Sequence, residues 1–110
     1  MPYHPERTFA ALADPTRRAV VERLASGPAT VSQLAQPFDM ALPSFTQHLG
    51  VLTEAGLVTS RREGRSRVCA LDPEGLRRAE AWMATYRQQW EDRMDRFAAH
   101  VASNEEDDDE

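Results

Sequence analysis

The sequence predicts a mainly α-helical domain with one small β-hairpin, and three observations lead to this fold class. Proline and glycine residues divide residues 5–57 into four short segments with apolar residues at helical spacing. The spacing then changes to that of two strands around Glu63-Gly64. From Pro73 to about Ala102, one apolar stripe at helical spacing predicts a long final helix.

The first two helices have clear start and stop signals. A short helix is expected over residues 5–13. Asp14 then precedes Pro15, and an acid at the N-cap followed by proline at the first helical position favours a helix start. Gly27-Pro28 is an equally strong stop signal, so a second helix is expected between these two points.

The next two helices are short and closely spaced. Thr30 and Gln33 have the spacing of a capping box, and Pro37 ends the helix that they begin. Residues 38–41 are too few for more than a turn, and a fourth helix begins near Pro43. Two short helices joined by a tight turn are typical of a helix-turn-helix.

The hairpin follows this helix pair directly. Its strands are expected in LVTSRR and SRVCAL, with the turn between them. A hairpin in this place is a wing, so the predicted fold is a winged helix-turn-helix. We expect a single domain over residues 1–102 and a disordered acidic tail over residues 103–110, because the tail lacks large apolar side chains.

The fourth helix has two different faces. A rotation of about 100° per residue groups the side chains expected to pack on the core, which are Leu42, Phe45, Leu49 and Leu52. The opposite face is formed by Pro43, Ser44, Gln47, Gly50 and Val51. Residues 43–53 carry no charge, and short hydroxyls and amides can reach base edges where acids would be repelled by phosphates. This helix is therefore predicted to enter the major groove of double-stranded DNA.

The predicted DNA contacts are of two kinds. Ser44 and Gln47 are expected to touch base edges, while Thr46 and His48, on the flanks of the same face, are expected to reach phosphates. Arginines of the wing are expected to hold the DNA backbone or enter the neighbouring minor groove; they are Arg62, Arg65 and Arg67.

Charge is distributed unevenly along the chain. The net charge of −5 argues at first against a nucleic-acid partner, but six of the eighteen acids lie in residues 105–110. Within residues 61–67, four arginines face one glutamate. All thirteen basic residues are arginine, which suits forked contacts with phosphate or guanine, and the codon bias of a GC-rich genome would explain that choice equally well.

The final helix carries a longer apolar stripe than a small domain can cover. We therefore expect a homodimer, in which this helix packs against its partner copy and the N-terminal helix. The candidate interface residues are Phe9, Leu76, Met83, Tyr86, Trp90 and Phe97. The alternative is that part of this stripe lines a pocket for an apolar inducer, through Trp82, Tyr86 and Trp90.

These motifs together resemble one known family. The order LADPTRR, TVSQLAQPF, LPSFTQHLGVLTEAGLV, RREGRSR and LDP is similar to the ArsR/SmtB winged-helix transcriptional regulators of bacteria, over residues 6 to about 100. The resemblance implies a homodimeric DNA-binding repressor that releases its operator when an inducer binds. The identity of that inducer does not follow from the sequence.

The chain departs from the metal-sensing members of this family. Where those carry a cysteine pair, this sequence has Thr30 and Ser32, which cannot act as thiolate ligands. His100 and His4 are isolated, so no metal site and no cofactor are expected. Cys69 is expected to be a half-buried structural residue of the second wing strand, since the chain has no second cysteine to resolve a redox switch.

Other functions are less well supported by the sequence. A winged helix that binds proteins is the alternative, but it needs neither an uncharged groove face nor a group of wing arginines. An enzyme is disfavoured, because no nucleophile and base pair, phosphate loop or metal cluster is visible. With no signal peptide or membrane span in the sequence, a cytoplasmic protein without a membrane partner is expected.

Overall fold

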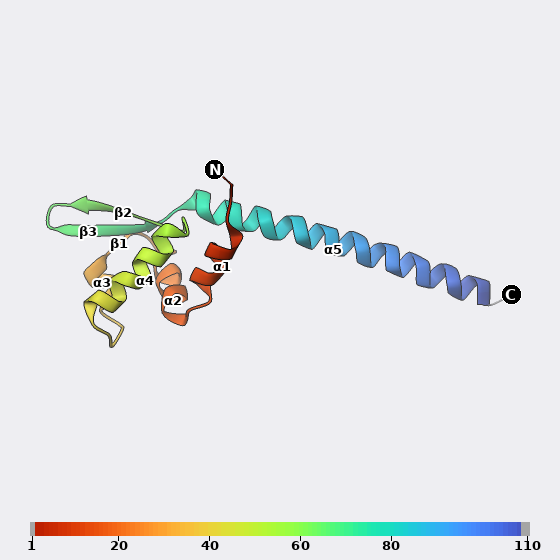
Figure 1. Ribbon diagram of the computed structural model, residues 1–110, viewed down its shortest axis with the longest axis horizontal. Coiled ribbons are helices and arrows are strands. Elements are labelled where there is room, and N and C mark those ends of the chain that lie inside the picture. The colour runs from red at the N-terminus through yellow and green to blue at the C-terminus, as the bar shows by residue number, and fades with distance from the viewer. Residues whose placement is uncertain (1, 109–110) are drawn as a thin grey trace. The chain divides into compact units, whose positions relative to one another are not determined.

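The computed structural model describes residues 2–108 and confirms the winged helix-turn-helix (Figure 1). Its elements are α1 (Pro5–Leu12), α2 (Pro15–Leu24), β1 (Ala29–Thr30), α3 (Val31–Ala35), α4 (Leu42–Glu54), β2 (Val58–Glu63), β3 (Ser66–Leu71) and α5 (Pro73–Asp108). The chain divides into two units, Met1–Ala79 and Glu80–Glu110. The first contains the helix-turn-helix and its hairpin, and the described part of the second is the remainder of α5.

The corner between α1 and α2 is stabilised by its own side chains. The Asp14 carboxylate accepts a hydrogen bond from the backbone N–H of Arg17 at 3.1 Å and so caps α2, as the sequence predicts. Arg17 and Arg18 then donate side-chain hydrogen bonds to backbone carbonyls at the end of α1, which are those of Ala10, Ala11, Leu12 and Ala13. Carbonyls at a helix C-terminus lack partners within the helix, although that of Ala10 also accepts from the Ala13 N–H at 3.2 Å. A cation at a helix C-terminus also interacts favourably with the helix dipole.

The start of α3 has the predicted capping box and also a strand that the sequence analysis missed. Gln33 N donates to Thr30 Oγ1 at 3.1 Å, and Thr30 N donates to Gln33 Oε1 at 2.9 Å. Because an N-cap residue is extended, Ala29 and Thr30 can pair with Cys69 and Val68 as the short strand β1. The hairpin is therefore part of a three-stranded antiparallel sheet in the order β1-β3-β2.

The wing is a regular hairpin. β2 and β3 pair from Val58 opposite Leu71 to Glu63 opposite Ser66, and the turn places Gly64 at a φ of +60°, which a glycine adopts without steric cost. Figure 1 shows α3 and α4 below this hairpin in the first unit.

The core lies between the helices of the first unit and the base of the sheet. Phe45, Leu49 and Leu52 of α4 are buried in it, and the Phe45 ring stacks on Phe38 with centroids 5.6 Å apart. The other core residues are Ala11, Val20, Leu24, Ala29, Leu34, Leu57, Val58 and Cys69. Burial of these apolar side chains is the main stabilising contribution to the fold.

Two burial predictions are corrected by the structure. Leu42 was expected in the core but is 56% exposed. It is the first residue of α4, and a helical side chain leans over the preceding turn, which is absent there. Cys69 was expected to be half-buried but is fully buried, since β1 adds a strand beside it.

The last helix also extends further than expected. The sequence predicts its end near Ala102, whereas α5 continues to Asp108. The expectation of a disordered tail rested on the lack of apolar side chains, which removes packing but does not itself end a helix. No proline or glycine follows Gly75 to end it. Residues 109 and 110 of the expected tail lie outside the described residues.

Gly75, in the first turn of α5, is expected to tolerate no side chain. A Cβ there would overlap the carbonyl oxygen of Gly56, and backbone cannot yield as a side-chain end can. We expect Gly75→Ala to lower the free energy of unfolding by about 1 to 3 kcal/mol in urea denaturation. Gly50→Ala, in open space within α4, is the control and is expected to raise it by about 0.5 to 1 kcal/mol. A Gly75→Ala variant as stable as the wild type would contradict this close packing.

Candidate nucleic-acid interface

The exposed face of α4 is the one that the sequence analysis assigns to DNA. Its exposed residues are Pro43, Ser44, Thr46, Gln47, Gly50 and Val51. Thr46 Oγ1 donates to the carbonyl oxygen of Pro43 at 2.9 Å, so this hydroxyl would have to exchange partners to donate to a phosphate. Ser44 and Gln47 make no side-chain hydrogen bond within the described chain, which leaves their polar atoms available to a ligand.

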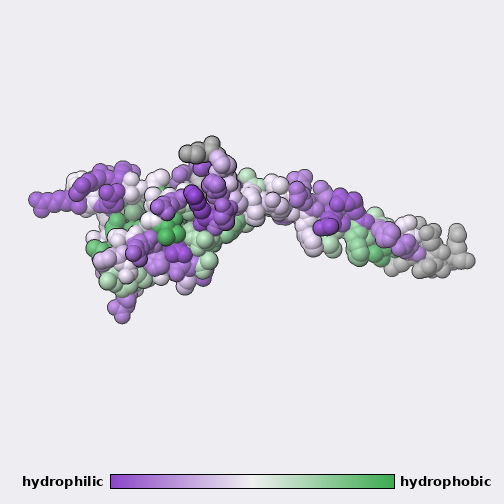
Figure 2. Space-filling model, in the orientation of Figure 1, coloured by the Kyte–Doolittle hydropathy of each residue, from purple (hydrophilic) through white to green (hydrophobic). Residues whose placement is uncertain are grey.

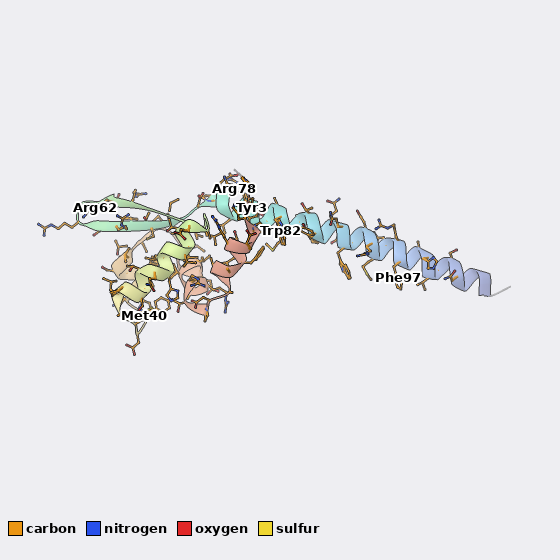
Figure 3. The ribbon with its side chains drawn as sticks, viewed as in Figure 1. Tyr3, Met40, Arg62, Arg78, Trp82 and Phe97 are labelled. Carbon is orange, nitrogen blue, oxygen red and sulfur yellow. The ribbon has the colours of Figure 1, made fainter. Side chains whose placement is uncertain are left out.

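The wing arginines are sorted onto two faces by strand alternation. Arg62 and Arg67 are paired across the hairpin, and Arg67 lies two residues from the buried Cys69, so both lie on the face that continues from the core. Arg61 lies on the other face, where its guanidinium contacts Glu63 at 3.2 Å. The hairpin surface is strongly hydrophilic (Figure 2), and Arg62 lies near its turn (Figure 3). The three wing arginines predicted from the sequence to contact DNA therefore do not include Arg61, which has an acidic partner.

A hollow of about 330 Å³ joins the wing to the N-terminal end of α4. It is lined by Leu42 and Thr46 of α4, by Arg65, Ser66 and Arg67 of the wing, and by Thr30, Val31 and Ser32 at the start of α3. The lining therefore combines two arginines of the wing with four residues that carry hydroxyls, which are Thr30, Ser32, Thr46 and Ser66. The structure brings together two of the three wing arginines and one of the four α4 residues that were predicted separately.

His48 is held by α2. Its Nδ1 lies 3.1 Å from Nη1 of Arg17 and 3.7 Å from Oδ2 of Asp14, and its side chain is 23% exposed. Neither Arg17 nor Asp14 is predicted from the sequence to be part of the site. Asp14 was recognised only as a cap, because no local pattern connects α2 with a histidine 31 residues beyond Arg17.

Two ionisable groups near the site have shifted pKa values. The backbone N–H of Arg17 lowers the pKa of the Asp14 carboxyl, so the group next to His48 is an anion at neutral pH. Burial raises the pKa of the Cys69 thiol, which keeps it protonated and unreactive.

Among residues 2–108, no group of three or more His, Cys, Asp or Glu side chains is placed to hold a metal ion. Thr30 and Ser32 contribute only hydroxyls to the hollow, and the absence of a metal site stays a prediction. No helix in this part of the chain combines the length and the apolar character needed to cross a bilayer.

The apolar stripe of α5 is exposed in the single chain. The large apolar residues involved beyond Glu80 are Trp82, Met83, Tyr86, Trp90, Met94, Phe97 and Val101, with Trp90 and Phe97 each 61% exposed. Figure 2 shows hydrophobic surface toward the C-terminal end of α5, where Figure 3 labels Phe97. The Trp82 and Tyr86 rings pack together, with their centroids 4.6 Å apart. Of the predicted interface residues in the first unit, Leu76 is exposed and Phe9 is half-buried.

Known proteins share both the sequence and this arrangement. A family model described as a helix-turn-helix domain matches residues 12–61. The HTH-type transcriptional regulator Rv2034 of Mycobacterium tuberculosis is 53% identical over 72 residues, which cover 66% of this chain and 67% of that protein. The crystal structure of an ArsR family transcriptional regulator matches with a TM-score of 0.74 and 52% identity, over 78% of this chain and 94% of that one. The chain belongs to the ArsR family.

Two further relatives of this ArsR family protein are also described as a repressor and as a DNA-binding domain. The transcriptional repressor SdpR of Bacillus subtilis is 31% identical over 78 residues, covering 71% of this chain and 87% of that protein. A solution structure from Mycobacterium bovis, described as a homodimeric winged helix-turn-helix DNA-binding domain, matches with a TM-score of 0.61 and 28% identity. It covers 76% of this chain and 78% of that chain.

Proposed function

We propose that this ArsR family protein is a transcriptional repressor that binds double-stranded DNA as a homodimer and is released by a small-molecule inducer. The observation that carries the proposal is the hollow that Arg65 and Arg67 of the wing line together with Thr46 of α4. Cations beside a charge-free helix face provide both parts of DNA recognition, which are a hold on the phosphates and access to base edges. Relatives named as regulators and repressors support it.

Within this proposal, α4 lies in the major groove and the wing follows the backbone. Ser44 and Gln47 read base edges, and the Gln47 amide can form a bidentate contact with adenine. Arg62, Arg65 and Arg67 neutralise phosphates or enter the adjacent minor groove.

Dimerisation follows from the apolar stripe of α5. Trp90 and Phe97 are exposed in the single chain, and large apolar residues continue along the same side of the helix as Met83, Met94 and Val101. An apolar stripe of this length that is exposed to solvent is typical of a protein–protein interface. A symmetric dimer presents two α4 helices, so its operator is an inverted repeat with half-sites one helical turn or a small multiple apart.

The proposal is tested by selecting duplexes from a randomised pool with the purified wild-type protein. We expect enrichment of an inverted repeat, bound at least about 1000-fold more tightly than scrambled duplexes. A pool that remains random after several rounds would contradict sequence-specific binding. It would favour the alternative of a winged helix that binds another protein.

A further inference from the structure

His48, Arg17 and Asp14 form a cluster that links α2 to α4. The closest contact joins His48 Nδ1 to Arg17 Nη1 at 3.1 Å, while the Asp14 carboxylate lies 3.7 Å from the same nitrogen. A guanidinium group can only donate hydrogen bonds. His48 Nδ1 must therefore accept, which requires a lone pair on Nδ1 and places the imidazole proton on Nε2.

The guanidinium group of Arg17 is held in position by hydrogen bonds to α1. Its Nε donates to the carbonyl oxygen of Ala11 at 2.7 Å, and its Nη2 donates to that of Ala10 at 3.1 Å. The guanidinium is thus attached to the end of α1 through two of its nitrogens, and the third faces α4. The Asp14 carboxylate is also committed, since it caps α2, and its distance from Nδ1 exceeds that of a hydrogen bond.

The other ring nitrogen is open to solvent. No buried side-chain nitrogen or oxygen lacks a hydrogen-bond partner in the part of the chain that the structure describes. His48 Nε2 has no hydrogen-bond partner within that part, so it must reach solvent. His48 lies on the flank of the uncharged α4 face, and a phosphate oxygen there could only accept a hydrogen bond.

We propose that Arg17 is a positioning residue that holds His48 in its Nε2–H tautomer, so that Nε2 donates a hydrogen bond to a DNA phosphate. This inference rests on the proposed function and adds Arg17 of α2 to the recognition apparatus. Arg17 acts on DNA through His48 without touching it. Asp14 is the competing partner, because it is the acceptor that a proton on Nδ1 would find if Arg17 were removed.

The first test reads the tautomer in the free protein. Long-range ¹⁵N NMR correlations of the imidazole, assigned by loss of the signal in His48→Gln, are expected to show Nε2 protonated and Nδ1 bare in the wild type. Arg17→Met is expected to shift His48 toward Nδ1 protonation. Arg18→Met is the matched control, because Arg18 donates to carbonyls of the same corner without contacting His48. An Nδ1–H tautomer in the wild type, or no change in Arg17→Met, would overturn the proposal.

The second test compares two replacements of His48 on a duplex bound by the wild type. The glutamine amide in His48→Gln can place a donor where Nε2 lies, whereas the shorter asparagine in His48→Asn reaches only the position of Nδ1. We expect His48→Gln to retain affinity within about 3-fold and His48→Asn to lose about 10-fold, equally on selected and scrambled duplexes. Equal losses in the two variants would overturn the phosphate contact.

The outcomes separate this inference from the function on which it rests. A wild-type protein that binds no duplex would overturn the DNA-binding function and the phosphate contact together. A wild-type protein that binds DNA, with His48→Asn binding equally well, would overturn the inference alone.

Discussion

Replacing Trp90 and Phe97 together by glutamate is expected to convert the protein from a dimer of about 25 kDa to a monomer of 12.4 kDa. Both rings are 61% exposed in the single chain. Burying a large apolar side chain contributes about 1.5 to 3 kcal/mol, and each ring occurs twice in a symmetric dimer. Four such contributions would be lost, and four carboxylates would have to be buried without partners. Light scattering after size exclusion at micromolar concentration measures the mass.

The control for this variant adds the same charge on the other side of α5. At about 100° per residue, Gln88 and Ala99 lie opposite Trp90 and Phe97, and both are exposed. We expect Gln88→Glu combined with Ala99→Glu to remain dimeric. If the Trp90 and Phe97 variant also stayed dimeric, α5 would not be the interface. The monomer is further expected to lose most of its affinity for an inverted repeat, because only one half-site can be held at a time.

Phe45→Ala is expected to lower the free energy of unfolding by about 3 to 5 kcal/mol. The ring is fully buried and stacks on Phe38, so its removal leaves a cavity between α4 and the turn before it. Urea denaturation at one fixed protein concentration measures the change, since the apparent stability of a dimer depends on concentration.

Leu42→Ala tests whether Leu42 is exposed, as in the structure, or buried in the core, as the sequence predicts. Leu42 belongs to the apolar stripe of α4 but is 56% exposed, so we expect a change within about 0.5 kcal/mol. A loss of unfolding free energy comparable to that of Phe45→Ala would show that Leu42 packs in the core.

The helices and the hairpin could be predicted because their signals are local. Asp14 before Pro15 and the capping box of Thr30 and Gln33 act within one turn, and the structure contains both caps. β1 could not be predicted in this way. It has two residues, and its pairing with β3 depends on a partner nearly 40 positions away rather than on an apolar repeat of its own.

The candidate site was predictable in its composition but only partly in its geometry. The period of a helix separates Gln47 from Phe45, and the period of a strand separates Arg62 from Arg61. The predicted contacts are therefore exposed, except for the half-buried His48. The contact between His48 and Arg17 joins two helices whose relative position depends on the whole core. The hollow beside Arg65 also needs the start of α3, to which the sequence assigned a capping box and no DNA contact.

In the proposed function, α4 reads the bases while the wing holds the DNA backbone. The most direct test is a salt titration of Gln47→Ala and Arg65→Ala on the selected inverted repeat and on its scrambled form. Gln47→Ala is predicted to cost about 1 to 3 kcal/mol on the repeat and little on scrambled DNA. Arg65→Ala is predicted to weaken both and to lower the salt slope by about one unit. Equal losses on the two duplexes for Gln47→Ala would contradict base reading by α4.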